Sequence, residues 1–174
     1  MEPKKKTAPR TQGRNNAHAA VFAEAPQNRH EIIERIYHEW DLALSRSDVD
    51  ALLALYASDA VLESPLVSHL MNKEVGICSG HDELRPFFEM LRERKPPVRQ
   101  HYRTGYFTDG KKLIWEYPRA NPKSEQMDFV EVMEINDEGL IQHHNVYWGR
   151  FGVRVLQRDE YRNKGERPGP GVRQ

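Results

Sequence analysis

The residues best suited to chemistry lie in the last predicted hairpin, which reads FVEVMEINDEGLIQHHNVYW over residues 129–148. Residues 136–139, Asn-Asp-Glu-Gly, have the composition of a tight turn and predict a four-residue loop between two strands. In that register Glu131 lies directly opposite His144, and directly opposed residues share one face of a sheet. Because the neighbouring positions are mainly apolar, the pattern predicts a carboxylate and an imidazole acting together in general acid–base catalysis.

The sequence leaves both the register of this hairpin and the role of the pair open. The four-residue loop also places Trp148 opposite Met127. A three-residue loop with a bulge at Gly139 would instead place Asn145 opposite Glu131. A Glu–His pair is also a common structural contact, so a second interpretation gives it no chemical role.

Other catalytic patterns are missing from the chain. The sequence has no glycine-rich phosphate loop, no His-Glu-x-x-His, no paired-cysteine metal site and no Gly-x-Ser-x-Gly. His143 and His144 are adjacent in a strand and point to opposite faces, which makes them a poor metal clamp. We therefore predict no metal and no cofactor. The single cysteine, Cys78, excludes an internal disulfide and predicts a reducing, cytoplasmic location.

Charge is balanced overall but unevenly distributed. Residues 1–14 carry a surplus of four positive charges, residues 157–174 a surplus of two, and the segment between them is acidic. An acidic core argues against nucleic-acid binding, and no apolar run is long enough to span a membrane. We predict a disordered basic tail over 1–27, one domain over 28–156 and a flexible C-terminal tail over 157–174.

The first half of the chain predicts three helices. An apolar stripe starts near Asn28 and continues past Trp40 at three- and four-residue spacing. A short helix over 51–57 follows, with Ser47 as the start of a capping box. The third helix begins at Gly80, with a kink or late start expected from its internal proline.

The second half predicts strands. A brief strand over 60–64 and a loop over 66–79 precede it. Four longer segments are rich in β-branched and aromatic residues and are separated by turn residues: 99–108, 112–118, 127–135 and 140–156. Helices followed by a meander of strands predict the α+β class, with helices packed on one face of an antiparallel sheet.

Three strings together resemble a known superfamily: DVDALLALYASDAVLESP (48–65), GHDEL (80–84) and the hairpin at 129–148. They are similar to ketosteroid isomerases and SnoaL-like polyketide cyclases, which share the nuclear transport factor 2-like fold. The resemblance covers roughly residues 29–156. It implies a cone-shaped curved antiparallel sheet and three N-terminal helices that enclose a pocket, in a homodimer formed through the sheet.

The resemblance also implies roles for single residues, and several depart from the isomerase pattern. The catalytic aspartate before proline falls on Ser64, and the oxyanion-binding tyrosine of the first helix falls on Trp40. Tyr56 matches a supporting tyrosine, whereas Phe88 replaces another. A chain without the carboxylate base and the main tyrosine donor is not expected to be a true steroid isomerase.

The same comparison places the hairpin pair at the pocket. Glu131 falls on the second oxyanion-hole acid, Trp148 on the pocket tryptophan, and His144 on an apolar lining position. Glu131 and His144 are therefore the predicted catalytic residues. The predicted substrate-binding residues are aromatic side chains and one serine: Trp40, Tyr56, Ser64, Phe88, Trp115, Tyr117, Phe129 and Trp148.

Three functions follow from these patterns. The first is binding of a small hydrophobic carbonyl-type compound, with cofactor-independent acid–base chemistry of isomerase or cyclase (lyase) type through Glu131 and His144. The second is a non-catalytic ligand-binding module, which the serine at position 64 favours. The third is a dimeric interaction protein whose cavity is filled by its own side chains. Fold alone does not separate them, because one fold hosts many functions.

Overall fold

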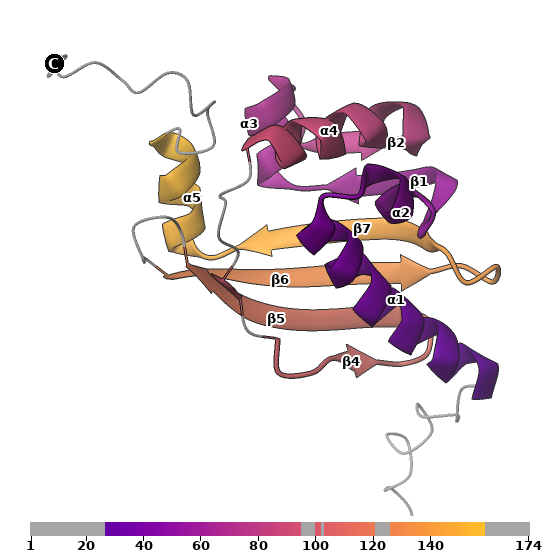
Figure 1. The fold of residues 1–174 in the computed structure, drawn as a ribbon. Coiled ribbons are helices and arrows are strands. Elements are labelled where there is room, and N and C mark those ends of the chain that lie inside the picture. Colours follow the sequence, from indigo (N-terminus) through magenta and orange to yellow (C-terminus); the bar gives the residue numbers. More distant parts are fainter. Residues whose placement is uncertain (1–26, 95–99, 102, 121–125, 159–174) are drawn as a thin grey trace, which may run out of the picture.

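A curved, open sheet forms the floor of the molecule (Figure 1). The computed structural model describes residues 27–94, 100–101, 103–120 and 126–158, so the two predicted tails lie almost wholly outside the described residues. The strand order is β2-β1-β7-β6-β5-β3, with β4 paired to β5. The strands are β1 Tyr56–Glu63, β2 Ile77–Ser79, β3 Gln100–His101, β4 Phe107–Thr108, β5 Lys112–Ala120, β6 Gln126–Ile135 and β7 Ile141–Trp148.

The pairing of these strands is antiparallel with one exception. β1 runs parallel to β7, with Leu62 opposite His144 and Glu63 opposite Asn145. A parallel pair needs a long connection, and here the chain between the two strands includes both the helix α4 and most of the sheet. This pairing brings the end of the short first strand beside the strand that carries His144.

Helices cover one face of the sheet. The elements are α1 Gln27–Arg46, α2 Val49–Leu53, α3 Pro65–Met71, α4 Gly80–Arg94 and α5 Arg150–Gln157. In Figure 1 α1 crosses β5, β6 and β7, while α3 and α4 lie over β1 and β2. No described helix is long and apolar enough to cross a membrane. The α+β class and the three predicted helices are thus confirmed, in α1, α2 and α4.

The loop predicted over 66–79 is wrong, because this segment contains α3 and β2. Ser64 caps α3 by accepting a hydrogen bond from the Leu66 N–H at 3.2 Å, and Pro65 occupies the first turn, where its missing N–H costs nothing. The helix ends at Asn72 with φ of 53°. Asparagine tolerates this left-handed conformation better than most residues. Local capping therefore defines a helix too short to show a clear period.

The strand predicted over 140–156 is also wrong from Gly149 onward. The Gly149 N–H donates to the Asp128 carbonyl at 2.8 Å, and Gly149 is the N-cap residue of α5, which begins at the next residue. Val153 favours a strand by propensity, yet it is 40% exposed on α5, whereas Phe151 and Leu156 pack against the core. Helical amphipathicity overrides β propensity here.

Smaller corrections concern helix ends and strand ends. Asp48, not Ser47, caps α2, accepting from the Ala51 N–H at 3.0 Å, and the helix ends at Leu53 so that β1 begins at Tyr56. The predicted strand over 99–108 is divided into β3 and β4. α4 begins at Gly80 and continues through Pro86.

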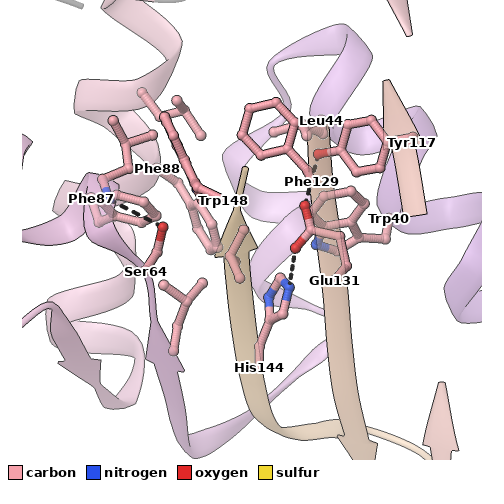
Figure 2. Close-up of a pocket in the computed structure, with 14 residues that line it drawn as sticks. Trp40, Leu44, Ser64, Phe87, Phe88, Tyr117, Phe129, Glu131, His144 and Trp148 are labelled. Carbon is pink, nitrogen blue, oxygen red and sulfur yellow. Dashed lines mark hydrogen bonds and ion pairs between the residues drawn. The ribbon is translucent and has the colours of Figure 1, made fainter. Parts of the chain in front are cut away.

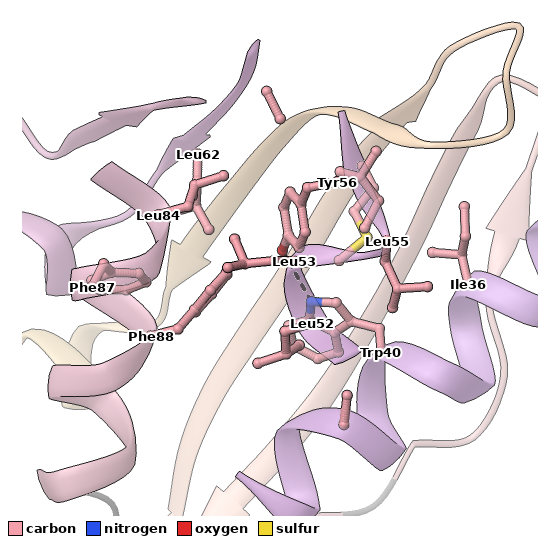
Figure 3. Close-up of a cluster of buried hydrophobic side chains, with 14 of the residues drawn as sticks. Ile36, Trp40, Leu52, Leu53, Leu55, Tyr56, Leu62, Leu84, Phe87 and Phe88 are labelled. Atoms are coloured by element: carbon pink, nitrogen blue, oxygen red, sulfur yellow. Dashed lines mark hydrogen bonds between the residues drawn. The ribbon is translucent and has the colours of Figure 1, made fainter. Parts of the chain in front are cut away.

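The core lies where α1, α2 and α4 meet the sheet (Figure 3). It is built from fully or nearly fully buried side chains of these three helices and the sheet, including Ile36, Trp40, Leu52, Leu62, Leu84 and Phe88. Each such aliphatic or aromatic side chain contributes about 1.5–3 kcal/mol by leaving water. The core fixes α1 and α4 at a set spacing over the sheet, and the space between them forms the pocket described next.

Candidate ligand pocket and acid–base site

A pocket lies between α1, α4 and the inner face of the sheet (Figure 2). The empty space inside it is about 500 Å³, part of which is continuous with solvent. Most of its walls are leucine, valine, phenylalanine and tryptophan, and within the part of the chain that the structure describes no lysine or arginine lines it. Glu131 and His144 supply its buried carboxylate and imidazole.

The structure brings most of the predicted site residues into this pocket. Those that line it are Trp40, Ser64, Phe88, Tyr117, Phe129, Glu131, His144 and Trp148. Tyr56 and Trp115 do not line it, and both are buried behind it.

Six further residues line the pocket and were not predicted from the sequence: Leu44, Leu62, Leu66, Phe87, Leu91 and Val146. Leu44, Phe87 and Leu91 lie on the apolar stripes of α1 and α4, and strand alternation places Val146 on the face of His144. Those stripes were the available signal, but a stripe alone does not separate a pocket wall from ordinary core.

The register of the β6–β7 hairpin differs from both predictions. Glu131 lies opposite Val146, and His144 lies opposite Met133. The connection is longer than expected, because Ile135 pairs with Ile141 and the ladder shifts by one residue directly after that pair. A slip of two residues from the four-residue-loop register leaves every side chain on its original face, because the side-chain period of a strand is two.

Glu131 is therefore a diagonal rather than a direct neighbour of His144. On its other side Glu131 lies opposite Trp115, which makes Tyr117 of β5 a second diagonal neighbour. Diagonal neighbours remain within reach of long side chains. His144 Nε2 lies 2.7 Å from Glu131 Oε2, and the Tyr117 hydroxyl donates to Glu131 Oε1 at 2.7 Å. The side chains of His144 and Glu131 are only 1% and 3% exposed.

A second layer extends this contact away from the pocket. The Tyr56 hydroxyl lies 2.7 Å from His144 Nδ1, and the Trp40 indole N–H donates to the Tyr56 oxygen at 3.0 Å. Burial raises the pKa of Tyr56; the hydrogen bond from Trp40 opposes this shift and the nearby charge of Glu131 adds to it. Tyr56 is therefore a protonated phenol that can both accept and donate.

The direction of these hydrogen bonds follows from Trp40, whose indole N–H can only donate. Since the Tyr56 oxygen accepts from Trp40, the Tyr56 proton finds its acceptor at His144 Nδ1. His144 then carries its own proton on Nε2, is neutral, and donates to an ionised Glu131. A proton on Nδ1 would leave the buried Tyr56 proton without an acceptor, at a cost of about 1–3 kcal/mol.

Ser64 contributes a different polar group from the end of β1. Its oxygen accepts from the Leu66 N–H as the cap of α3, which leaves the hydroxyl proton available to an acceptor in the pocket. Figure 2 shows this serine on the opposite side of the pocket from Glu131 and Tyr117. The pocket thus offers a proton donor at one wall and a carboxylate at the other.

Trp115 has a supporting place in this arrangement. Its ring packs edge-on against Trp40 and Tyr37, each with ring centroids 5.5 Å apart. Its indole N–H is buried and has no hydrogen-bond partner within the part of the chain that the structure describes. The geometry makes Trp115 a support that holds Trp40 in position. No group of three or more metal-ligating side chains occurs among the described residues.

The curved sheet with helices over one face and a pocket between them defines the nuclear transport factor 2-like class of folds. Within that class the sequence model of the SnoaL-like domain matches residues 33–144, which is more than half of the chain. The chain therefore belongs to the SnoaL-like domain family. A search of curated proteins found no match.

Solved structures agree with this fold. A SnoaL-like protein of unknown function from Burkholderia thailandensis is 17% identical, with a TM-score of 0.58 over 68% of this chain and 95% of that one. A steroid delta-isomerase from Pseudomonas aeruginosa is 17% identical, with a TM-score of 0.57 over 80% of this chain and 93% of that one. SalBIII, an epoxide hydrolase/cyclase-like enzyme with a role in pyran ring formation in the polyether salinomycin, is 21% identical. Its TM-score is 0.52 over 72% of this chain and 93% of that one. At these identities the likeness shows the fold alone.

Proposed function

We propose that this protein binds a small, largely apolar carbonyl-type compound in the pocket and catalyses a cofactor-independent proton transfer of isomerase or cyclase type. The observation that carries the proposal is the buried Glu131 carboxylate, held in the pocket wall by two hydrogen bonds from Tyr117 and His144. A carboxylate in apolar surroundings, oriented by fixed donors, is a suitable general base.

In the proposed step Glu131 takes a proton from a carbon next to the carbonyl group. The electron pair of that C–H bond moves onto the carbonyl oxygen, where the Ser64 hydroxyl can donate a hydrogen bond. Glu131 then returns the proton to a different atom of the same molecule, so the reaction needs no other reactant. His144 keeps Glu131 oriented throughout, through its Nε2–H.

Position 64 supports a function other than steroid isomerisation. Ser64 carries a hydroxyl that caps α3, and a hydroxyl cannot replace the carboxylate base of that reaction. Glu131 is the carboxylate that remains at the pocket, on a different strand.

The same serine favours a second candidate, a protein that carries or senses its ligand without turnover. Mass spectrometry of any compound that co-purifies with the protein would supply the ligand. Melting curves and a panel of isomerase, cyclase and hydrolase assays then separate the two functions. Turnover that Glu131→Gln abolishes supports the enzyme, and a melting shift without turnover supports the carrier.

A homodimer formed through the outer face of the sheet is part of the proposal. Phe107 and Tyr147 are 78% and 58% exposed, and Ile114 lies directly opposite Phe107 on the same sheet. Exposed apolar groups on one face are typical of an interface. Sedimentation velocity should give a dimer that Tyr147→Asp dissociates, and a monomeric wild-type protein would contradict it. The cytoplasm remains the proposed location.

An adaptor with a filled cavity, the third function that the sequence allowed, receives less support. Met127 and Met133 are 1% and 0% exposed and do not line the pocket, which is partly open to solvent.

A further inference from the structure

We infer that the ligand of this pocket carries no anionic group and presents an O–H or N–H donor to Glu131. The inference rests on the ligand-binding half of the proposed function and names the class of ligand. It does not depend on whether the bound molecule is turned over.

Glu131 and the two groups that donate to it offer acceptors and no free donor. An ionised carboxylate has about four sites for accepted hydrogen bonds, and Tyr117 and His144 occupy one on each oxygen. Both of those donors use their hydrogen in the hydrogen bond to Glu131, while His144 Nδ1 accepts from the Tyr56 hydroxyl. A ligand that reaches Glu131 therefore forms a hydrogen bond with it only by donating.

No cation among the described residues of the pocket neutralises the charge of this wall. With His144 neutral, the pair carries one negative charge, and none of the described residues that line the pocket is lysine or arginine. The guanidinium of Arg103 lies 5.9 Å from the Trp115 ring, but it is paired with Asp41 at 3.2 Å and donates to the Tyr37 carbonyl. A carboxylate or phosphate ligand would place a second negative charge in apolar surroundings, where like charges repel strongly.

The opposite wall has the complementary polarity. The Ser64 proton suits a carbonyl oxygen, so an uncharged compound with an acceptor at one end and a donor at the other would satisfy both walls. An amine satisfies the Glu131 wall in the same way and adds an attraction between opposite charges.

Three probes with one ring system test this ligand class on the full chain: 2-naphthylmethanol, 2-naphthylmethylamine and 2-naphthoate. Binding is followed by tryptophan fluorescence, since Trp40 and Trp148 line the pocket. We expect the alcohol and the amine to bind at least tenfold more tightly than the carboxylate. Naphthoate binding as tight as that of the alcohol, or no binding of any probe at millimolar concentration, would overturn the inference.

Two variants locate the effect. Glu131→Gln should bring the three dissociation constants within about threefold of one another, whereas Glu134→Gln, on the outer face of the same strand, should keep the wild-type ratio. An unchanged ratio in Glu131→Gln would also overturn the inference. If that variant does not fold, the wild-type ratio still decides. Selective binding without turnover in any assay would remove the proposed catalysis and leave the ligand class standing.

Discussion

Two pairs of identical residue types stand on the two faces of one hairpin. On the inner face, His144 and Glu131 form a buried pair 2.7 Å apart, with Tyr56 and Tyr117 as further partners. On the outer face, His143 lies opposite Glu134, and Glu134 is 45% exposed and paired with Lys112 at 3.0 Å. The comparison shows that residue type alone does not define a site. Burial and fixed donors distinguish the pair suited to acid–base chemistry from the solvated one.

The largest difference is expected in turnover once the substrate is known. Glu131→Gln removes the base and should lower kcat by about 10²–10⁴-fold, the usual contribution of a general acid–base group. Glu134→Gln changes the same residue type on the other face and should leave kcat within about twofold. Equal kinetics in the two variants would end the assignment of Glu131.

Substituting the two histidines should change the unfolding free energy by different amounts. His144→Ala leaves the Tyr56 proton without an acceptor and the buried Glu131 charge with Tyr117 as its remaining donor. Breaking a buried pair in this way costs about 3–5 kcal/mol of unfolding free energy. His143→Ala should stay within about 0.5 kcal/mol, as surface substitutions do. Urea denaturation measures both, and a His144→Ala protein as stable as wild type would show that the pair is not buried in solution.

A smaller effect is expected one layer behind the pocket. Tyr56→Phe removes the link between the Trp40 N–H and His144 Nδ1 and should cost about 1–3 kcal/mol of unfolding free energy. Because the substitution keeps the ring, packing against Phe88 is retained. The double variant Trp40→Phe/Tyr56→Phe should lose less unfolding free energy than the sum of the losses in the two single variants. Additive losses would mean that the two groups are not coupled.

The smallest effect is expected for the ion pair of Glu134 with Lys112 on the outer face of the sheet. The hydrogen bond and charge of Glu134 raise the pKa of the exposed Lys112 ammonium. Water and salt screen such a pair. Lys112→Ala should therefore give an unfolding midpoint indistinguishable from wild type in 0.5 M salt. A clear loss of stability at that salt concentration would contradict the solvated character assigned to this face.

The sequence predicted faces better than it predicted registers. Strand alternation placed Glu131 and His144 on one face, and that result survives because the true register differs from the four-residue-loop register by two residues. The shift of the ladder after Ile135 depends on how the connection packs, and the turn residues alone did not reveal it.

The contact of Tyr56 with His144 could not be predicted from local sequence patterns. Tyr56 reaches His144 across 88 positions of the chain, through the parallel pairing of β1 with β7. Propensity and periodicity describe neighbours in sequence, so they carry no information on such a contact. The family resemblance supplied Tyr56 as a supporting residue, but not the direction of the hydrogen bonds that it transmits from Trp40.

The proposed site depends on a neutral His144, with its proton on Nε2, beside an ionised Glu131. The most direct measurement is a long-range ¹H–¹⁵N correlation spectrum of histidine-labelled protein at neutral pH, with His143→Gln and His144→Gln to assign the two rings. We expect one fixed Nε2–H tautomer for His144 and an averaged, solvent-exchanging ring for His143. A positively charged His144 ring, or one protonated on Nδ1, would contradict it.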